Sequence, residues 1–225
     1  MAEGIDWDWI GRHTDDIATA TIDHLQLVGA GVGLAVAVAL PTAVALRNHP
    51  IGATIASSTA TVLYTIPSLA LFAFLIPVFG IGKTPAILGL AIYAVGVLLR
   101  NTVTGLRGVP APVLEAARGM GLNRRQVLLK VELPLAVPAI LTGIRLATIE
   151  TVAIATIAAF VAGGGLGELI LNNGIERNLF VTPIVAGTVI AVCMALTLDL
   201  ALVGVQRIAT PWSRRIAIRP DEARP

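Results

Sequence analysis

The chain has 225 residues, of which 56% are hydrophobic and only 13% are charged. A soluble domain carries about 25% charged residues, so this composition excludes an ordinary water-soluble enzyme and indicates a protein whose solvent is lipid. The formal net charge of +2 says little as a sum, and its distribution is more informative. The single cysteine, Cys193, excludes an internal disulfide, and the scattered His13, His24 and His49 predict no metal site.

The N-terminal segment, residues 1–24, is acidic, and Arg12 is its only basic residue apart from histidine. A secretory signal peptide needs a positive N-terminal region, so none is predicted here. The acidic side chains are Glu3, Asp6, Asp8, Asp15, Asp16 and Asp23.

Apolar runs then recur along the chain. A helix rises about 1.5 Å per residue, so about 20 apolar residues cross a hydrocarbon core about 30 Å thick. The runs are 25–46, 54–76, 84–99, 135–162 and 181–205, and the third is the shortest. The sequence therefore predicts an all-α fold, a polytopic transmembrane helix bundle of about five spans. This domain occupies residues 25–211, and a polar tail follows at 212–225.

Basic residues are divided unequally between the two sides that five spans create. One side would hold only Arg12, Lys83 and Arg177. The other would hold Arg47, Arg100, Arg107, Arg118, Arg124, Arg125, Lys130, Arg207, Arg214, Arg215, Arg219 and Arg224. Cytoplasmic loops carry the excess of Lys and Arg, so we expect the C-terminus in the cytoplasm and the N-terminus outside.

Tyr64, Pro67 and Ser68 stand out in the second run. Tyr64 and Ser68 would share one helix face at the i, i+4 spacing, and Pro67 could open the backbone between them. We treat these residues as candidates for lining a translocation path.

The segment between the third and fourth runs, residues 100–134, predicts two short helices. Pro112 suits a first helical turn, Gly121 permits a left-handed stop and Asn123 can cap a second helix, which Pro134 would break. Such a rigid helix–turn–helix can transmit force to another protein. The alternative is an amphipathic connection that lies on anionic lipid.

Three ionisable residues, Arg145, Glu150 and Asp199, lie in or near apolar runs. A charge in mid-bilayer costs about 2.5–3.5 kcal/mol on insertion scales, so each should face protein or water. Glu150, with the adjacent Thr151, could line a solute path, or Glu150 could make a helix–helix contact, with Arg145 as one possible partner. For Asp199 we expect a structural role.

A glycine run follows the fourth apolar run. Gly164 and Gly165 lie within Gly163-Gly164-Gly165-Leu166-Gly167, where no strand–helix unit surrounds them, so a dinucleotide site is not predicted. The run predicts a tight turn, or a gate or docking loop on the outer side.

The segment Glu115-Ala116-Ala117, followed by Gly121 and by Leu133-Pro134, resembles the EAA loop of bacterial ABC importer permeases. In that family the loop is the coupling helix that docks on a cytoplasmic ATPase. The resemblance implies polar contacts from Glu115, close docking at Ala116 and Ala117, and a turn at Gly121. Leu122 and Pro134 would belong to the same coupling site.

The resemblance extends over about residues 25–211 to permeases of the osmoprotectant family. It is carried by Tyr64-Thr65-Ile66-Pro67-Ser68-Leu69-Ala70, Gly80-Ile81-Gly82, Gly143-Ile144-Arg145 and the 163–167 run. This family imports glycine betaine, choline, carnitine and proline derivatives, which implies a type I importer permease fold. Methionine importer permeases share the five spans and the EAA loop, and match less well at Thr65–Ala70.

The resemblance also implies the partners: a dimer of cytoplasmic ABC ATPases, a second permease chain that is identical or a paralogue, and an extracytoplasmic binding protein. No domain follows the last run before Pro225, so we expect the binding protein to be separate and, since aromatic residues make up only 4%, to hold most of the selectivity. The expected location is a bacterial cell membrane.

Other classes remain open. An ATP-independent channel or facilitator would need no coupling loop, and an intramembrane enzyme would need a catalytic constellation that the runs lack. Gly82-Lys83-Thr84 resembles the end of a phosphate-binding loop, but Pro77 stands where the first glycine is required. We therefore expect no catalytic residue, cofactor or nucleic-acid partner, and ATP hydrolysis only in the partner ATPase.

Overall fold

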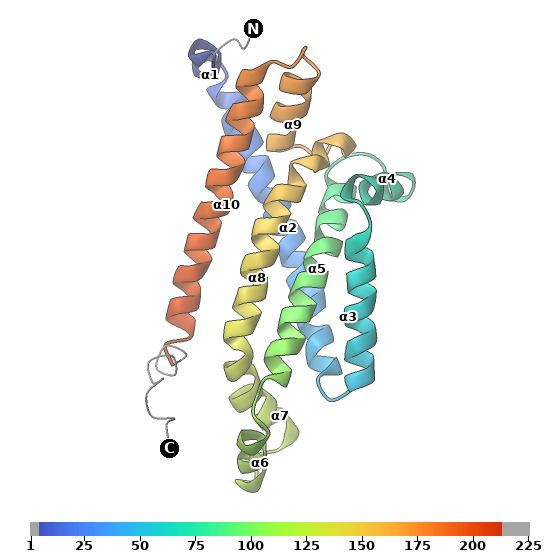
Figure 1. Ribbon diagram of the computed structural model, residues 1–225, viewed down its shortest axis with the longest axis vertical. Coiled ribbons are helices and arrows are strands. Elements are labelled where there is room, and N and C mark those ends of the chain that lie inside the picture. The colour runs from blue at the N-terminus through green and yellow to red at the C-terminus, as the bar shows by residue number, and fades with distance from the viewer. Residues whose placement is uncertain (1–4, 213–225) are drawn as a thin grey trace, which may run out of the picture.

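A computed structural model describes residues 5–212, and this part of the chain contains helices and no strands (Figure 1). The elements in chain order are α1 Trp7–Arg12, α2 Thr14–Leu46, α3 Pro50–Thr65, α4 Ser68–Phe79, α5 Lys83–Arg107, α6 Ala111–Gly119, α7 Arg124–Val127, η1 Leu128–Glu132, α8 Leu133–Ala155, η2 Ile157–Val161, α9 Leu166–Ile170, η3 Leu171–Ile175 and α10 Val181–Ala209. The long helices run side by side, with α1 and α9 at one end and α6 and α7 at the other.

Within the described residues, four helices are long and apolar enough to cross a membrane. They are α2, α5, α10 and the unbroken stretch Arg124–Ala155 that joins α7, η1 and α8. A fifth crossing exists only if α3 and α4 are counted together, because they are bent by 97° at a short break. The expected fold class of about five spans is confirmed, and the apolar run 54–76 is broken at Pro67, where the sequence suggested that the backbone could open.

Pro67 causes this bend. The residue before a proline is pushed out of the helical region, and Ile66 is extended, with φ −65° and ψ 128°. The freed carbonyl of Ile66 accepts a hydrogen bond from the hydroxyl of Tyr93 in α5, so the break is satisfied inside the protein. Irregular backbone at membrane depth needs such a partner.

Helix α5 is the central element, and it packs against α2, α3, α4 and α8. Glycines make these contacts close: a Cβ added at Gly89 would meet the Phe72 ring at 2.5 Å, and one at Gly105 would meet Ala139 at 2.7 Å. Small residues let helix backbones approach where lipid supplies no hydrophobic driving force. The helix also continues about two turns beyond the expected end at Leu99, so residues 100–107 belong to it.

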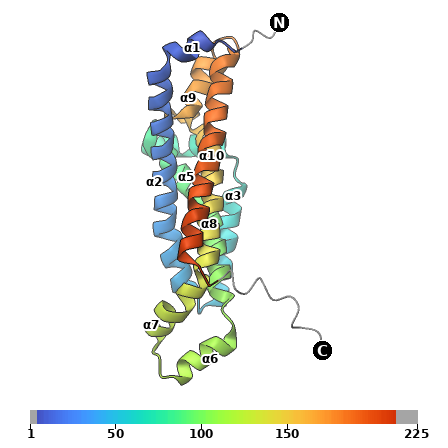
Figure 2. The same ribbon diagram turned by 90° about the vertical axis from the view of Figure 1, so that its left-hand side faces the viewer.

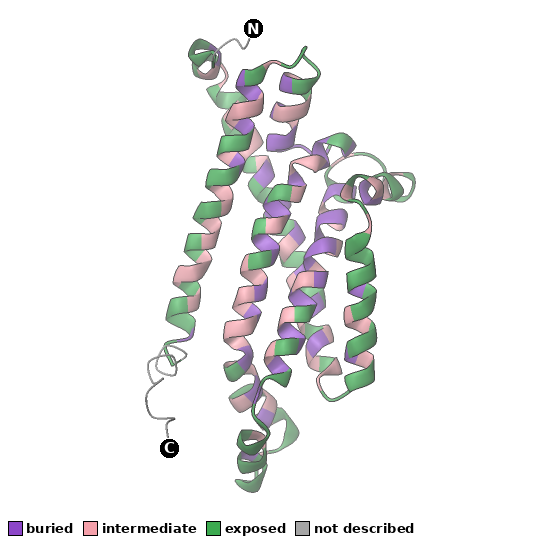
Figure 3. Ribbon diagram, viewed as in Figure 1, coloured by how far each residue is buried: buried purple, intermediate pink, exposed green. Residues whose placement is uncertain are grey.

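Helices α3 and α10 lie at the sides of the bundle, and most of their residues are exposed or half-buried (Figure 3). On α10 the exposed side chains are mostly apolar, among them Val189, Val192, Leu196 and Leu200. On α3 they include several hydroxyl residues. The surface of α10 therefore suits lipid or an apolar partner, whereas α3 exposes apolar and hydroxyl side chains together.

The described basic residues follow the division expected from the sequence. α1 lies at one end of the bundle, and the α6–α7 segment lies at the opposite end, as the turned view also shows (Figure 2). Five charged residues that were used to predict this division lie outside the described residues: Glu3, Arg214, Arg215, Arg219 and Arg224.

Candidate functional site

The α6–α7 turn has the local geometry that its sequence predicts. Gly121 has φ +81°, a left-handed conformation, and its N–H donates to Arg118 O at 2.9 Å. The N–H of Leu122 donates to Ala117 O at 3.2 Å. These two bonds close a Schellman motif, which satisfies carbonyls left free at the end of α6. The turn at Gly121 is confirmed.

The second helix of this segment begins with a capping box. The side chain of Asn123 accepts from Gln126 N, and the side chain of Gln126 accepts from Asn123 N, each at 2.9 Å. Both exchanges satisfy backbone donors at the helix start. The capping role expected for Asn123 is confirmed.

Pro134 does not break the helix, and that expectation is wrong. η1 is a wider π-turn in which Leu133 N donates to Leu128 O, and Pro134 follows in the first turn of α8. A proline lacks the N–H that a helix interior requires, and the wider turn just before it absorbs this loss. Residues 124–155 therefore form one continuous rod that starts at the coupling turn.

The residues expected to dock on an ATPase divide into two groups. Glu115, Ala116 and Gly121 are exposed, whereas Ala117 is buried and Leu122 is half-buried. Other side chains exposed on this segment, which were not singled out for docking, include Val113, Arg118 and Met120. A segment at the end of a bundle that exposes both apolar and charged side chains is suited to contact another protein.

Arg47 and Glu132 anchor the base of the rod, and sequence reasoning missed this pair. Arg47 Nε donates to Glu132 Oε2 at 2.9 Å, and Arg47 Nη1 donates to Val44 O at 2.9 Å. The Glu132 residue is almost fully buried. Its carboxylate ties η1 to the end of α2, next to a basin of about 520 Å³ lined by Arg47, Asn48, His49, Arg118, Leu122, Arg124, Val127 and Glu132.

A second polar cluster lies on the face formed by α3, α5 and α8. The rings of Tyr64 and Tyr93 meet edge to face with centroids 5.7 Å apart. The carboxyl group of Glu150 interacts with the Tyr64 hydroxyl and with the charge of Arg100. Its Oε2 atom is buried and has no hydrogen-bond partner within residues 5–212. Arg100 Nη2 donates to Thr61 Oγ1 at 3.0 Å.

A groove of about 470 Å³ continues from this cluster toward the α6–α7 end. It runs between α3 and α5 and is lined by Ala53, Thr54, Ser57, Ser58, Thr61, Val62, Arg100, Val103, Thr104 and Arg107. Hydroxyls and guanidinium groups are costly in lipid, so this groove must face water or protein.

The candidates expected to line a path are only partly brought together. Tyr64 and Glu150 meet, but Ser68 begins α4 beyond the bend, so the shared helix face expected for Tyr64 and Ser68 is wrong. Thr151 is buried, and its hydroxyl donates to Ala147 O at 2.6 Å within α8. Gly164 and Gly165 lie at the α1–α9 end, away from this cluster.

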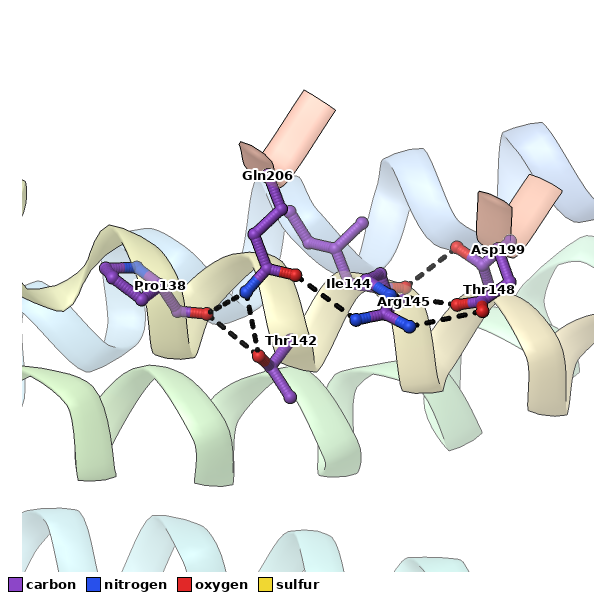
Figure 4. A network of polar contacts seen from close by, with 7 residues as sticks. All are labelled: Pro138, Thr142, Ile144, Arg145, Thr148, Asp199 and Gln206. Atoms are coloured by element: carbon purple, nitrogen blue, oxygen red, sulfur yellow. Dashed lines mark hydrogen bonds and ion pairs between the residues drawn. The ribbon is translucent and has the colours of Figure 1, made fainter. Parts of the chain in front are cut away.

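Arg145 pairs with Asp199, not with Glu150, and joins α8 to α10 (Figure 4). Its Nε and Nη2 donate to the two carboxylate oxygens of Asp199 at 2.8 and 3.1 Å, and Nη1 donates to Gln206 Oε1 at 3.2 Å. Gln206 Nε2 in turn reaches Pro138 O at 3.3 Å. This bidentate pair agrees with the structural role expected for Asp199.

The glycine run at the α1–α9 end forms a tight turn, as expected, with φ +85° at Gly164 and +80° at Gly165. It packs on His24, which is fully buried and was not singled out from the sequence. His24 Nδ1 accepts from Leu166 N at 3.3 Å, so Nε2 carries the proton and donates to Val152 O at 3.1 Å. One neutral imidazole thus joins α2, α8 and α9.

Comparison with known proteins identifies the family. The model of the family described as binding-protein-dependent transport system inner membrane component matches residues 31–215. The chain belongs to this family. Such a permease is a transport subunit and not an enzyme, and ATP hydrolysis is carried out by a partner ATPase. Membership also places it in a membrane as a multi-pass protein.

Two relatives from Bacillus subtilis (strain 168) resemble this permease over most of its length. The choline transport system permease protein OpuBB is 41% identical over 85% of this chain and 87% of its own. The glycine betaine/carnitine/choline transport system permease protein OpuCB is 40% identical over 85% of this chain and 87% of its own.

Among solved structures, an inward-facing MetNI methionine ABC transporter aligns with a TM-score of 0.78, covering 86% of this chain and 96% of the other at 23% identity. At that identity the likeness establishes the fold alone. It confirms the type I importer permease fold and does not favour methionine as the solute.

Proposed function

We propose that this permease carries quaternary ammonium osmoprotectants, such as choline, carnitine and glycine betaine, into the cell as part of an ATP-driven importer. The observation that carries the coupling mechanism is the α6–α7 turn, with Glu115 and Ala116 exposed and Gly121 in a left-handed conformation. The solute class rests on relatives about 40% identical, and proline derivatives belong to the same class.

Coupling follows from the continuity of the rod. α6 docks on one subunit of a cytoplasmic ATPase dimer, and closure of that dimer displaces it. Since residues 124–155 form one helix and Glu132 fastens its base to Arg47, the displacement reaches Arg145 and Glu150 without a hinge. Each of those side chains contacts a neighbouring helix, so the relative positions of α8, α10 and α3 change with the ATPase.

The solute path runs along the face of α3, α5 and α8, opposite a second permease chain. The polar groove supports this placement, since its hydroxyl and guanidinium groups cannot face lipid. Tyr64, Pro67 and Glu150 line the path at the helix break. Thr151 holds the neighbouring turn of α8 in place, and Ser68, Gly164 and Gly165 contribute to the outer gate.

The orientation has the α1–α9 end outside, facing a binding protein, and the α6–α7 end in the cytoplasm. This orientation can be tested with single cysteines at Met120 and at Asn173 in a Cys193→Ala background, because the two residues lie at opposite ends of the molecule. A membrane-impermeant maleimide added to intact cells should label the Asn173→Cys protein and leave the Met120→Cys protein unlabelled. The reverse labelling would invert the orientation.

The decisive test of the function is uptake of labelled choline and carnitine at high osmolarity. Transporter-null cells should receive this permease with its ATPase, its binding protein and any second permease. ATP-dependent uptake of either solute is the expected result. Uptake that persists after ATP depletion would indicate a channel, and an ATPase-active complex that imports neither would point to methionine or another small solute.

A further inference from the structure

Four side chains from three helices lie near one another on one side of the bundle: Tyr64 of α3, Tyr93 and Arg100 of α5, and Glu150 of α8. We propose that they form a binding station for one quaternary ammonium solute on its way through the permease. The two tyrosines and Glu150 take the ammonium group, and Arg100 takes the carboxylate of solutes that have one. This station rests on the proposed function and gives the path a defined chemistry.

The tyrosine pair supplies an aromatic surface. Tyr93 is 5% exposed, and its hydroxyl is bound to Ile66 O at the helix break, so its ring has a fixed orientation. Tyr64 stands edge to face against it and is 39% exposed, so Tyr64 is the ring that a solute can reach. Aromatic faces attract quaternary ammonium groups through the ring quadrupole.

Glu150 supplies a negative charge that the protein leaves incompletely compensated. Its Oε2 is buried without a hydrogen-bond partner in the described part of the chain, and the cation that acts on it, Arg100, is also bonded to Thr61. A buried carboxylate without full compensation is unfavourable. A quaternary ammonium group neutralises this charge and needs no hydrogen bond of its own, since it has no N–H to donate.

Arg100 supplies the opposite charge from the groove side. Its guanidinium is exposed, and the bond to Thr61 uses one of its five N–H donors. Arg100 lies seven residues after Tyr93, about 10 Å along α5, which separates the positive from the negative part of the station. A guanidinium binds a carboxylate through two parallel hydrogen bonds. The station is thus neutral overall and dipolar, like a betaine.

This division of roles makes a prediction that depends on the solute. Choline has an ammonium group and no carboxylate, whereas carnitine has both. Arg100→Gln should therefore lower carnitine uptake about tenfold, the size expected for lost charge-assisted hydrogen bonds, and lower choline uptake far less. Glu150→Gln should lower uptake of both. Tyr64→Phe keeps the aromatic ring and should retain choline uptake. Tyr64→Leu removes the ring and should lower choline uptake several-fold.

The experiment uses the complete complex in cells, with initial rates of both solutes and membrane levels of each variant. Arg12→Gln is the control, because Arg12 is an exposed arginine of α1 that donates to Asp8 O and lies outside the groove. Equal loss of both solutes in Arg100→Gln, or the same split between solutes in Arg12→Gln, overturns the station and leaves the proposed function standing. A wild-type complex that imports neither solute refutes the proposed function itself.

Discussion

The two ends of this bundle are held in different ways. At the α1–α9 end, contacts between distant residues close the structure: His24 joins three elements, Lys83 pairs with Asp23 at 2.7 Å, and Asp6 N donates to the hydroxyl of Thr182 at 2.9 Å. At the other end, α6 extends beyond the long helices and is held mainly by its own turn and by α7 and η1.

This difference indicates which end moves relative to its surroundings. The α1–α9 end resists local rearrangement, because breaking the hydrogen bonds of His24 would leave buried polar groups without a partner. The α6–α7 end has a rigid local turn but few contacts with the long helices, so a docked protein can displace it as a unit. A coupling element requires a locally rigid docking turn at the end of one continuous helix.

The largest effect is expected from a substitution that distorts the turn at the α6–α7 end. Gly121→Val places a β-branched residue at φ +81°, a conformation that such residues almost never adopt, and should distort the turn. We expect uptake to fall by more than tenfold while the protein remains in the membrane. The measurement is initial uptake together with ATPase activity of the complex.

Gly119→Val is the matched control for this change. Neither glycine has an atom within 4 Å of an added Cβ, and only Gly121 has a positive φ. The control should therefore retain most of the uptake. If Gly121→Val transports normally, the coupling role of this turn is wrong.

At the closed end, His24→Ala should cost stability. It removes a fully buried ring, and leaves the N–H of Leu166 without its acceptor, so we expect a loss of about 2–5 kcal/mol. Thermal unfolding of the purified permease in detergent measures it. His49→Ala, at an exposed position, is the control and should unfold close to wild type. Equal midpoints for both variants would contradict the bridging role of His24.

Between the ends, the Arg145–Asp199 pair should show a favourable coupling energy for unfolding in a double-mutant cycle. Arg145→Leu or Asp199→Leu alone leaves one charge half-buried near the apolar α8–α10 contact, whereas the double variant removes both. The double variant should therefore be more stable than the sum of the single losses predicts. Additive losses in a double-mutant cycle would show that the two side chains act independently.

The smallest effect is expected for Lys83→Gln. Its partner Asp23 and Lys83 itself are 29% and 49% exposed, and pairs in water contribute less than about 1 kcal/mol. The unfolding midpoint should shift little, and the shift should vanish at high salt. A loss comparable with that of His24→Ala would mean that this ion pair, and not the histidine, holds the closed end together.

What the sequence could predict was local. The α6–α7 turn was predictable because its hydrogen bonds join residues at most five apart, from Leu122 to Ala117, and because only glycine readily takes the conformation of Gly121. The spans were predictable from the length of the apolar runs. The expected break at Pro134 failed because the π-turn that precedes it is not visible in residue types.

What only the tertiary structure decided was which helix faces meet. The spans are apolar on nearly all sides, so their pattern does not tell which side is buried. The partners that matter are far apart in the chain: Arg145 and Asp199 by 54 residues, Arg47 and Glu132 by 85, and His24 and Leu166 by 142. Glu150 was recognisable as costly in lipid, but only packing of α3, α5 and α8 brings Tyr64 and Arg100 to it. Composition and local chemistry thus determined a membrane bundle with a coupling turn, and close helix packing determined where its charges meet.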